Sequence, residues 1–111
     1  MSKIFSFVRV NNNNEVYTKE QKKGLETYIN KNNFSIYQAI EVQINTPDDE
    51  KNILDFLKNC QSSSTLLVYD LHVFGRTIET ILEIVKFLLS NKIRIVVIKQ
   101  NLDLVDDKDM L

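Results

Sequence analysis

The chain has 111 residues, of which 43% are hydrophobic and 26% are charged, so it is long enough for one soluble domain with a single buried core. Lys and Arg number 14 against 15 Asp and Glu. The resulting formal net charge of −1 argues against strong nonspecific nucleic-acid binding by this segment alone, while it leaves room for a local basic patch.

No segment has the pattern of a targeting or membrane-spanning element. Residues 1–10 lack the apolar core of a signal peptide, and no apolar run reaches the length of a membrane span. The single cysteine, Cys60, excludes an intramolecular disulfide, and its place at the end of a helical pattern indicates a semi-buried structural thiol. We therefore expect a cytoplasmic protein that binds no membrane, metal or cofactor.

The first half of the chain predicts a strand, a helix and a second strand. Residues 3–10 alternate between two faces and are rich in β-branched and aromatic side chains, which is typical of a strand. The four asparagines at 11–14 predict a loop. Thr18 is the expected cap of a helix that ends near Lys31, and residues 34–44 alternate again as a half-exposed or edge strand.

The middle of the chain predicts a second helix. Residues 45–50 form a loop in which Thr46 or Asp48 is the expected cap, because acidic side chains suit the positive end of a helix. The apolar positions predict a buried face made of Ile53, Leu54, Phe56 and Leu57.

The second half predicts two further strands around a third helix. Residues 65–69 are almost entirely apolar, as in a central parallel strand, and residues 92–99 predict the last strand. Thr77 caps a helix that runs to about Ser90. The apolar face of this helix is too wide for one side against water. The helix therefore either also contacts a partner or is a well-covered core helix, and we give both readings equal weight. Residues 101–111 are acidic and predict a loop, an edge strand or the start of a truncated helix.

This order of elements predicts one α/β domain over residues 1–111. Short connections and right-handed crossovers give three layers, with a mostly parallel sheet of four to five strands and helices on both faces. The carboxyl ends of parallel strands meet at one edge, where ligands collect in such folds. Residues 9–11 and 70–76 should lie at that edge.

Three stretches resemble the N-terminal catalytic domain of serine recombinases, the resolvase and DNA-invertase family. Residues 7–11 (FVRVN) sit where that family has Tyr-Ala-Arg-Val-Ser. Residues 67–77 (LVYDLHVFGRT) sit where it has a strand running into Leu-Asp-Arg-Leu-Gly-Arg-Ser, and residues 98–103 (IKQNLD) match Leu-Thr-Glu-Asn-Ile-Asp. The resemblance implies a resolvase-like fold. It also implies attack of a serine hydroxyl on a DNA phosphodiester, with arginines stabilising the transferred phosphoryl group.

The chain departs from this family at the reacting group. Asn11 occupies the nucleophile's position, an amide cannot form the phosphoester, and residues 11–16 contain no Ser or Thr. The family's serine-glycine and arginine-proline pairs have no counterpart in residues 44–50, where Pro47 falls near the arginine's position. The glutamine of the family's first helix is missing near Gly24. We therefore expect no catalytic residue in this chain.

The candidate binding residues are Arg9 and Arg76, which match two family arginines and could form a phosphate- or DNA-binding pair. The alternative is that each forms a salt bridge, for example with Asp70. His72, at the position of the family's aspartate, could serve in acid–base chemistry or be a plain polar residue, and Asp70 could simply hold the loop. Val73 replaces the family's first arginine in this stretch.

Three functions fit this sequence. The first is a catalytically inactive recombinase-like domain that acts through oligomerisation or regulates DNA recombination, with a second copy or a related recombinase as its partner. DNA contact through this domain alone would then be weak. The second is a recombinase or nuclease with a non-standard site that uses His72 and the two arginines. The third is a small-anion or nucleotide-binding domain, which ranks last because the chain has only two glycines and no glycine-rich phosphate loop.

Overall fold

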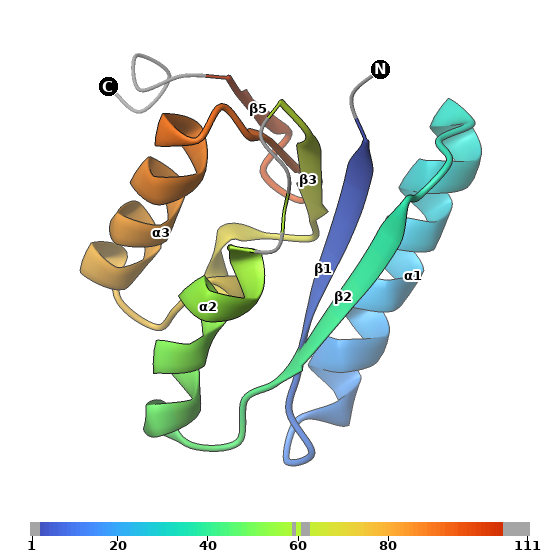
Figure 1. Cartoon of the computed structure of the whole chain (residues 1–111). Coiled ribbons are helices and arrows are strands. Elements are labelled where there is room, and N and C mark those ends of the chain that lie inside the picture. Colours follow the sequence, from blue (N-terminus) through green and yellow to red (C-terminus); the bar gives the residue numbers. More distant parts are fainter. Residues whose placement is uncertain (1–2, 59, 61–62, 106–111) are drawn as a thin grey trace.

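Strands and helices alternate along the chain, as the sequence pattern predicts (Figure 1). The computed structural model describes residues 3–58, 60 and 63–105. In chain order the elements are β1 (Ile4–Val10), α1 (Glu15–Asn32), β2 (Gln38–Gln43), the 3₁₀ helix η1 (Pro47–Asn52), α2 (Ile53–Leu57), β3 (Thr65–Val68), the 3₁₀ helix η2 (Leu71–Val73), α3 (Ile78–Ser90), β4 (Arg94–Val97) and β5 (Leu102–Leu104).

The strands form one five-stranded sheet in the order β2-β1-β3-β4-β5. The first four strands are parallel, and β5 pairs antiparallel with β4. β3 is the central strand, and its last three residues are fully buried, which confirms the interpretation of residues 65–69. The mostly parallel α/β class is confirmed too. Residues 102–104 are an edge strand, whereas the other expectations for the acidic tail extend into residues 106–111, outside the described residues.

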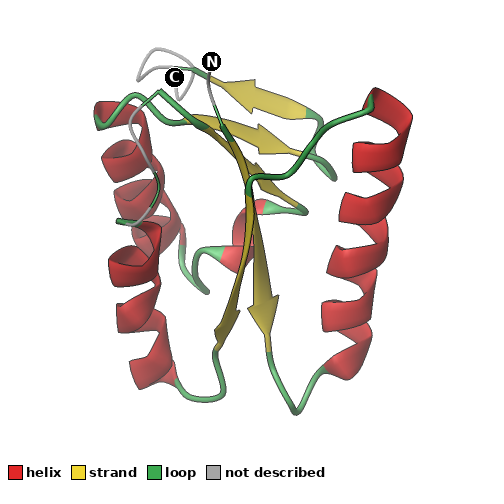
Figure 2. Cartoon of the chain, turned by 45° about the vertical axis from the view of Figure 1, so that its right-hand side comes forward, coloured by secondary structure: helices red, strands yellow, loops and turns green. Residues whose placement is uncertain are grey.

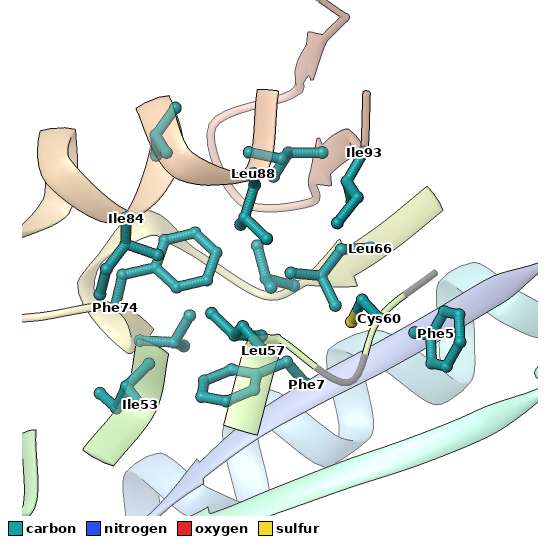
Figure 3. Packing of buried hydrophobic residues seen from close by; sticks show 14 of the residues in the cluster. Phe5, Phe7, Ile53, Leu57, Cys60, Leu66, Phe74, Ile84, Leu88 and Ile93 are labelled. Atoms are coloured by element: carbon teal, nitrogen blue, oxygen red, sulfur yellow. The ribbon is translucent and has the colours of Figure 1, made fainter. Parts of the chain in front are cut away.

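Helices cover both faces of the sheet, but unequally (Figure 2). α2 and α3 lie on one face and enclose the larger core, in which side chains of both helices and of the sheet pack together (Figure 3). The other face carries α1, whose Leu25 packs on Val8, Leu67 and Val96. Two ion pairs lie at the flanks of α1. Lys22 of α1 pairs with Glu41 of β2 at 3.0 Å, and Arg94 of β4 pairs with Asp103 of β5 at 2.7 Å.

The first helix begins earlier than the sequence pattern predicts. Its cap is Asn14, whose side chain accepts the N–H of Tyr17 at 3.2 Å, so the prediction of Thr18 as the cap is wrong. Asparagine caps a helix at least as well as threonine does, and the pattern could not choose between them. The helix ends as expected for asparagines, because Asn33 adopts the left-handed conformation, with φ of 54°.

The second helical segment is shorter and more exposed than predicted. Thr46 is the cap, as one of the two expectations had it, and Asp49 closes the capping box by accepting the N–H groups of Asn45 and Thr46 at 2.9 and 3.0 Å. Ile53 and Leu57 are fully buried, but Phe56 is 44% exposed, so its predicted burial is wrong. Ile53 and Leu57, four residues apart, face the core and Leu54 packs partly against it, whereas Phe56 faces solvent.

The third helix is largely a core helix. Thr77 caps it and accepts the N–H of Thr80 at 3.2 Å, as predicted. Most of its wide apolar face is buried against the sheet and α2, namely Ile81, Ile84, Val85, Leu88 and Leu89. Ile78 and Leu82 remain 74% and 40% exposed. The core therefore explains most of the apolar width, and these two residues form the remaining apolar surface on α3.

Gly24 allows α1 to lie close to the end of β3. A Cβ atom at this position would lie 2.5 Å from Cδ1 of Tyr69, well inside van der Waals contact. The Tyr69 ring is also held in place, because its hydroxyl donates to Oε1 of Glu20 at 2.9 Å. The glycine that weakens the helix locally is thus required by the packing of a ring against it.

We expect Gly24→Ala to lower the free energy of unfolding by about 1 kcal/mol, because the overpacking cost exceeds the gain of about 1 kcal/mol in helix propensity. In a Tyr69→Ala background, where the ring is absent, the same substitution should instead stabilise the protein by about 1 kcal/mol. Urea unfolding of the four proteins measures this reversal. Equal effects in both backgrounds would show that the ring does not constrain this position.

Candidate functional site

A polar cluster lies at the carboxyl ends of the neighbouring parallel strands β1 and β3. Arg9 is the penultimate residue of β1, and Asp70 follows β3 by two positions. The register that pairs Phe7 with Val68 brings Arg9 level with Asp70. The first turns of α1 add Tyr17 and Gln21, and η1 adds Glu50. The structure therefore gathers five polar side chains at the edge where the sequence places the site.

Arg9 is paired inside this cluster. Its side chain is only 8% exposed, and its Nη1 donates to Oε1 of Glu50 at 3.0 Å. A buried guanidinium requires such a partner, because its charge cannot be neutralised by loss of a proton. For Arg9 the structure therefore shows the salt-bridge alternative. Its partner is Glu50 and not the suggested Asp70.

Gln21 fixes the end of β1 to α1. The side chain is fully buried, accepts the N–H of Arg9 through Oε1 at 2.9 Å and donates from Nε2 to the Arg9 carbonyl at 2.8 Å. Gln21 lies three residues before Gly24, near which the family's glutamine was predicted to be missing, and the motif comparison alone does not single it out. The available signal was its spacing, because Gln21 lies four residues after Tyr17 and four before Leu25, on the face that the helix buries.

Asp70, for which the sequence suggested a role in holding its own loop, contacts the start of α1. It is 2% exposed, and its Oδ1 accepts the hydroxyl of Tyr17 at 2.6 Å. Burial, followed by the hydrogen bond to Asp70 and the charge of that carboxylate, raises the pKa of Tyr17 far above its ordinary range. The phenol is therefore a permanent hydrogen-bond donor at neutral pH.

The charge balance of the cluster is unfavourable for an incoming phosphate. One guanidinium, that of Arg9, stands against the two carboxylates of Glu50 and Asp70. Stabilising a phosphoryl group requires an excess of positive charge and free N–H donors directed at its oxygens. The arrangement is therefore suited to holding β1, β3, α1 and η1 together.

Asn11 uses its amide within the loop that leads into α1. Its Oδ1 accepts the N–H of Asn13 at 2.8 Å, and its carbonyl accepts the N–H of Asn14 at 3.0 Å. Its own N–H donates to Oγ1 of Thr18 at 3.4 Å. These contacts form a turn stabilised by an asparagine side chain, which is the usual structural role of this residue type.

The structure does not join Arg76 and His72 to the cluster. Both side chains are exposed, and neither forms a hydrogen bond or ion pair with another described residue. Gly75, in contrast, is buried, and a Cβ atom there would lie 2.6 Å from Cγ2 of Thr80. Packing against α3 therefore accounts for the glycine of this stretch, while Arg76 stays free on the surface.

Neither a metal centre nor a membrane span is found in the part of the chain that the structure describes. No group of three or more His, Cys, Asp or Glu side chains among those residues could hold a metal ion. The helices formed by those residues are too short or too polar to cross a bilayer.

Comparison with known proteins identifies the family. A family model described as "Resolvase, N terminal domain" matches residues 4–111. The chain belongs to the resolvase N-terminal domain family. The resemblance seen in the sequence is thereby confirmed, and the chain is a resolvase-type domain associated by family with DNA recombination. No curated protein sequence matches it.

Two solved structures share the fold of this resolvase-type domain. The N-terminal catalytic domain of TP901-1 integrase matches with a TM-score of 0.68 and 18% identity, over 92% of this chain and 81% of that one. A resolvase family site-specific recombinase from Streptococcus pneumoniae matches with a TM-score of 0.70 and 18% identity, over 99% of this chain and 80% of that one.

The hydrogen bonds of the buried Gln21 amide should contribute measurably to the free energy of unfolding. We expect Gln21→Leu to lower the free energy of unfolding by about 2–4 kcal/mol, since it leaves the buried N–H and carbonyl of Arg9 without partners. Gln43→Leu, at an exposed position of β2, should change it by less than about 0.5 kcal/mol. Urea unfolding measures both. A loss equal to that of the control would show that the two Gln21–Arg9 hydrogen bonds do not stabilise the fold.

The buried phenol predicts a stability loss at high pH. The pKa of Tyr17 is higher in the folded chain than the ordinary value of about 10. The contribution of the protonated phenol to the free energy of unfolding is therefore complete below about pH 10 and falls as the pH rises further. Burial likewise raises the pKa of Cys60 to about 11, which adds a loss of the same sign from about pH 9 upward.

Tyr17→Phe should therefore show a shallower loss of stability above pH 10 than the wild type, in urea unfolding between pH 8 and 11. Tyr37→Phe removes an exposed phenol and should keep the wild-type slope. Identical slopes for wild type and Tyr17→Phe would contradict the assignment.

Proposed function

We propose that this resolvase-type domain does not cleave DNA and that it acts in DNA recombination by associating with another resolvase-type domain. The observation that carries the proposal is Asn11, which stands where the family has its serine and whose amide is used in a turn. An amide provides neither an ionisable hydroxyl nor a nucleophilic nitrogen, so it cannot form the covalent link to phosphate.

The remaining groups of the cluster do not replace the missing serine. Arg9 is occupied by Glu50, and an approaching phosphate would meet the carboxylates of Glu50 and Asp70. The Tyr17 hydroxyl donates to the buried carboxylate of Asp70, but its raised pKa makes the reactive phenolate scarce. Arg76 and His72 are surface residues without a described contact to this cluster.

Association is supported by the apolar surface that the core leaves on α3. Ile78 and Leu82 are one helical turn apart and therefore share a face, and both are exposed. The formal net charge of −1 gives the domain little general attraction for DNA. An exposed apolar surface, on a domain with little general attraction for DNA, fits a role through contacts with other proteins. The partner we favour is a second copy of this chain, with a related recombinase as the alternative.

The first test is incubation with supercoiled plasmid, followed by denaturing electrophoresis that detects nicks and covalent protein–DNA adducts. We expect neither for the wild type, nor for Asn11→Ser, because a restored hydroxyl still faces an occupied Arg9. An adduct formed by the wild type would contradict the proposal. Its loss in Tyr17→Phe would assign the chemistry to the phenol, and its loss in His72→Ala or Arg76→Ala would favour the non-standard recombinase.

The second test is sedimentation velocity over a range of concentrations. We expect the wild type to form a dimer and the double variant Ile78→Glu/Leu82→Glu to be monomeric, because charges cannot be buried unpaired in an apolar contact. Lys86→Glu changes the net charge by the same amount on the same helix and should dimerise like the wild type. A wild type that is strictly monomeric and binds no related recombinase would refute the association.

A further inference from the structure

The ion pair between Arg9 and Glu50 lies beside an open groove. The groove has a volume of about 370 Å³ and separates η1 and α2 from α3, with Glu50, Lys51 and Leu54 on one side and Thr80 and Glu83 on the other. Glu50 lines this groove, whereas Arg9 does not and is 7% exposed. The carboxylate therefore stands between the guanidinium and the solvent-accessible space.

The segment that carries Glu50 is held mainly by contacts within itself. η1 contains no buried residue, and its capping box joins Asp49 to Asn45 and Thr46. Those hydrogen bonds keep the pKa of Asp49 below its ordinary value, so the box is stable at neutral pH. Within the described part of the chain, the Arg9–Glu50 pair is the polar contact that ties η1 to the sheet.

Both ends of this segment are firmly anchored. Ile44, which precedes it, is 1% exposed, and Ile53, which follows it, is fully buried. A short segment with fixed ends, a locally closed cap and one side-chain contact to the sheet can move away as a unit without loss of core packing. Its position then depends on what pairs with Arg9.

We propose that Glu50 is an internal competitor that closes an oxyanion site at Arg9, and that η1 is the lid of this site. The ligand class is a doubly charged tetrahedral oxyanion, such as a phosphate or sulfate group. A guanidinium offers several N–H donors in one plane, and Glu50 is hydrogen-bonded to Nη1 alone. This inference rests on the proposed function in treating the edge as closed to phosphate by Glu50, and adds that the closure is reversible because η1 can move away with Glu50.

The physical argument is one of charge compensation. Removing the carboxylate leaves Arg9 buried and unpaired, which is strongly unfavourable, and an external oxyanion can then supply the missing charge. Asp70 keeps its place on Tyr17, so the cluster would hold one guanidinium and one carboxylate, and the gain in anion affinity would be moderate.

The test is titration of ¹⁵N-labelled protein with sodium sulfate, against sodium chloride at equal ionic strength, following the Arg9 Nε–H and backbone N–H signals. We expect Glu50→Gln to bind sulfate about tenfold or more tightly than the wild type, the change that corresponds to losing one competing contact. Asp48→Asn is the matched control. It removes the same charge from the same segment at an exposed position, and should bind like the wild type.

Two further variants make the outcome decisive. Arg9→Gln/Glu50→Gln should lose the sulfate affinity, and retained binding would place the anion elsewhere and overturn the proposal. Equal affinities for Glu50→Gln and Asp48→Asn would overturn it as well. Should Glu50→Gln be unfolded in chloride, recovery of its folded spectrum in sulfate, to a greater extent than sulfate stabilises Arg9→Gln/Glu50→Gln, supports the site, and an equal or absent effect refutes it. None of these readouts depends on DNA cleavage, so this inference can fail while the proposed function stands, and the reverse.

Discussion

Arg9 places a permanent positive charge near the end of a strand whose neighbours are buried, and the carboxyl edge of the sheet is arranged around it. Glu50 pairs with the guanidinium, and Gln21 binds both backbone groups of the same residue. The two contacts draw η1 and α1 onto the end of β1 from opposite faces of the sheet. A single charged residue thereby fixes the relative positions of a strand, a helix and a connecting segment.

The same arrangement changes what the edge can do chemically. An arginine at this edge can stabilise a phosphate only when its N–H groups are free to meet the phosphate oxygens. Here the guanidinium faces a carboxylate of its own chain, and a second carboxylate lies level with it across the strand pair. The amide of Asn11 accepts a hydrogen bond within the loop. The described side chains at this edge thus contact one another and hold β1, α1 and η1 together.

The two faces of the sheet are covered by different means. α2 and α3 build a broad apolar core, whereas α1 packs its one apolar stripe on the other face and approaches closely through Gly24. Beside α1, ion pairs between Lys22 and Glu41 and between Arg94 and Asp103 lie at the border of this face with water. Exposed apolar side chains occur on each α-helix, at Val16 on α1, at Phe56 on α2 and at Ile78 and Leu82 on α3. The proposed contact with another domain uses the pair on α3, which lies on one face of that helix.

The sequence by itself determined the order of the elements, the central strand, the cap at Thr77 and the family, and it narrowed the cap of the second helical segment to Thr46 or Asp48. These features depend on periodicity, local hydrogen bonds and short motifs, which neighbouring residues specify. Only the tertiary structure decided that Glu50 pairs with Arg9, that Gln21 is buried and that Phe56 faces solvent. Arg9 and Glu50 are 41 positions apart, and residue types alone left several carboxylates as equal candidates. Which of them meets the guanidinium depends on how strand register and helix packing place the chain in space, which no local pattern contains.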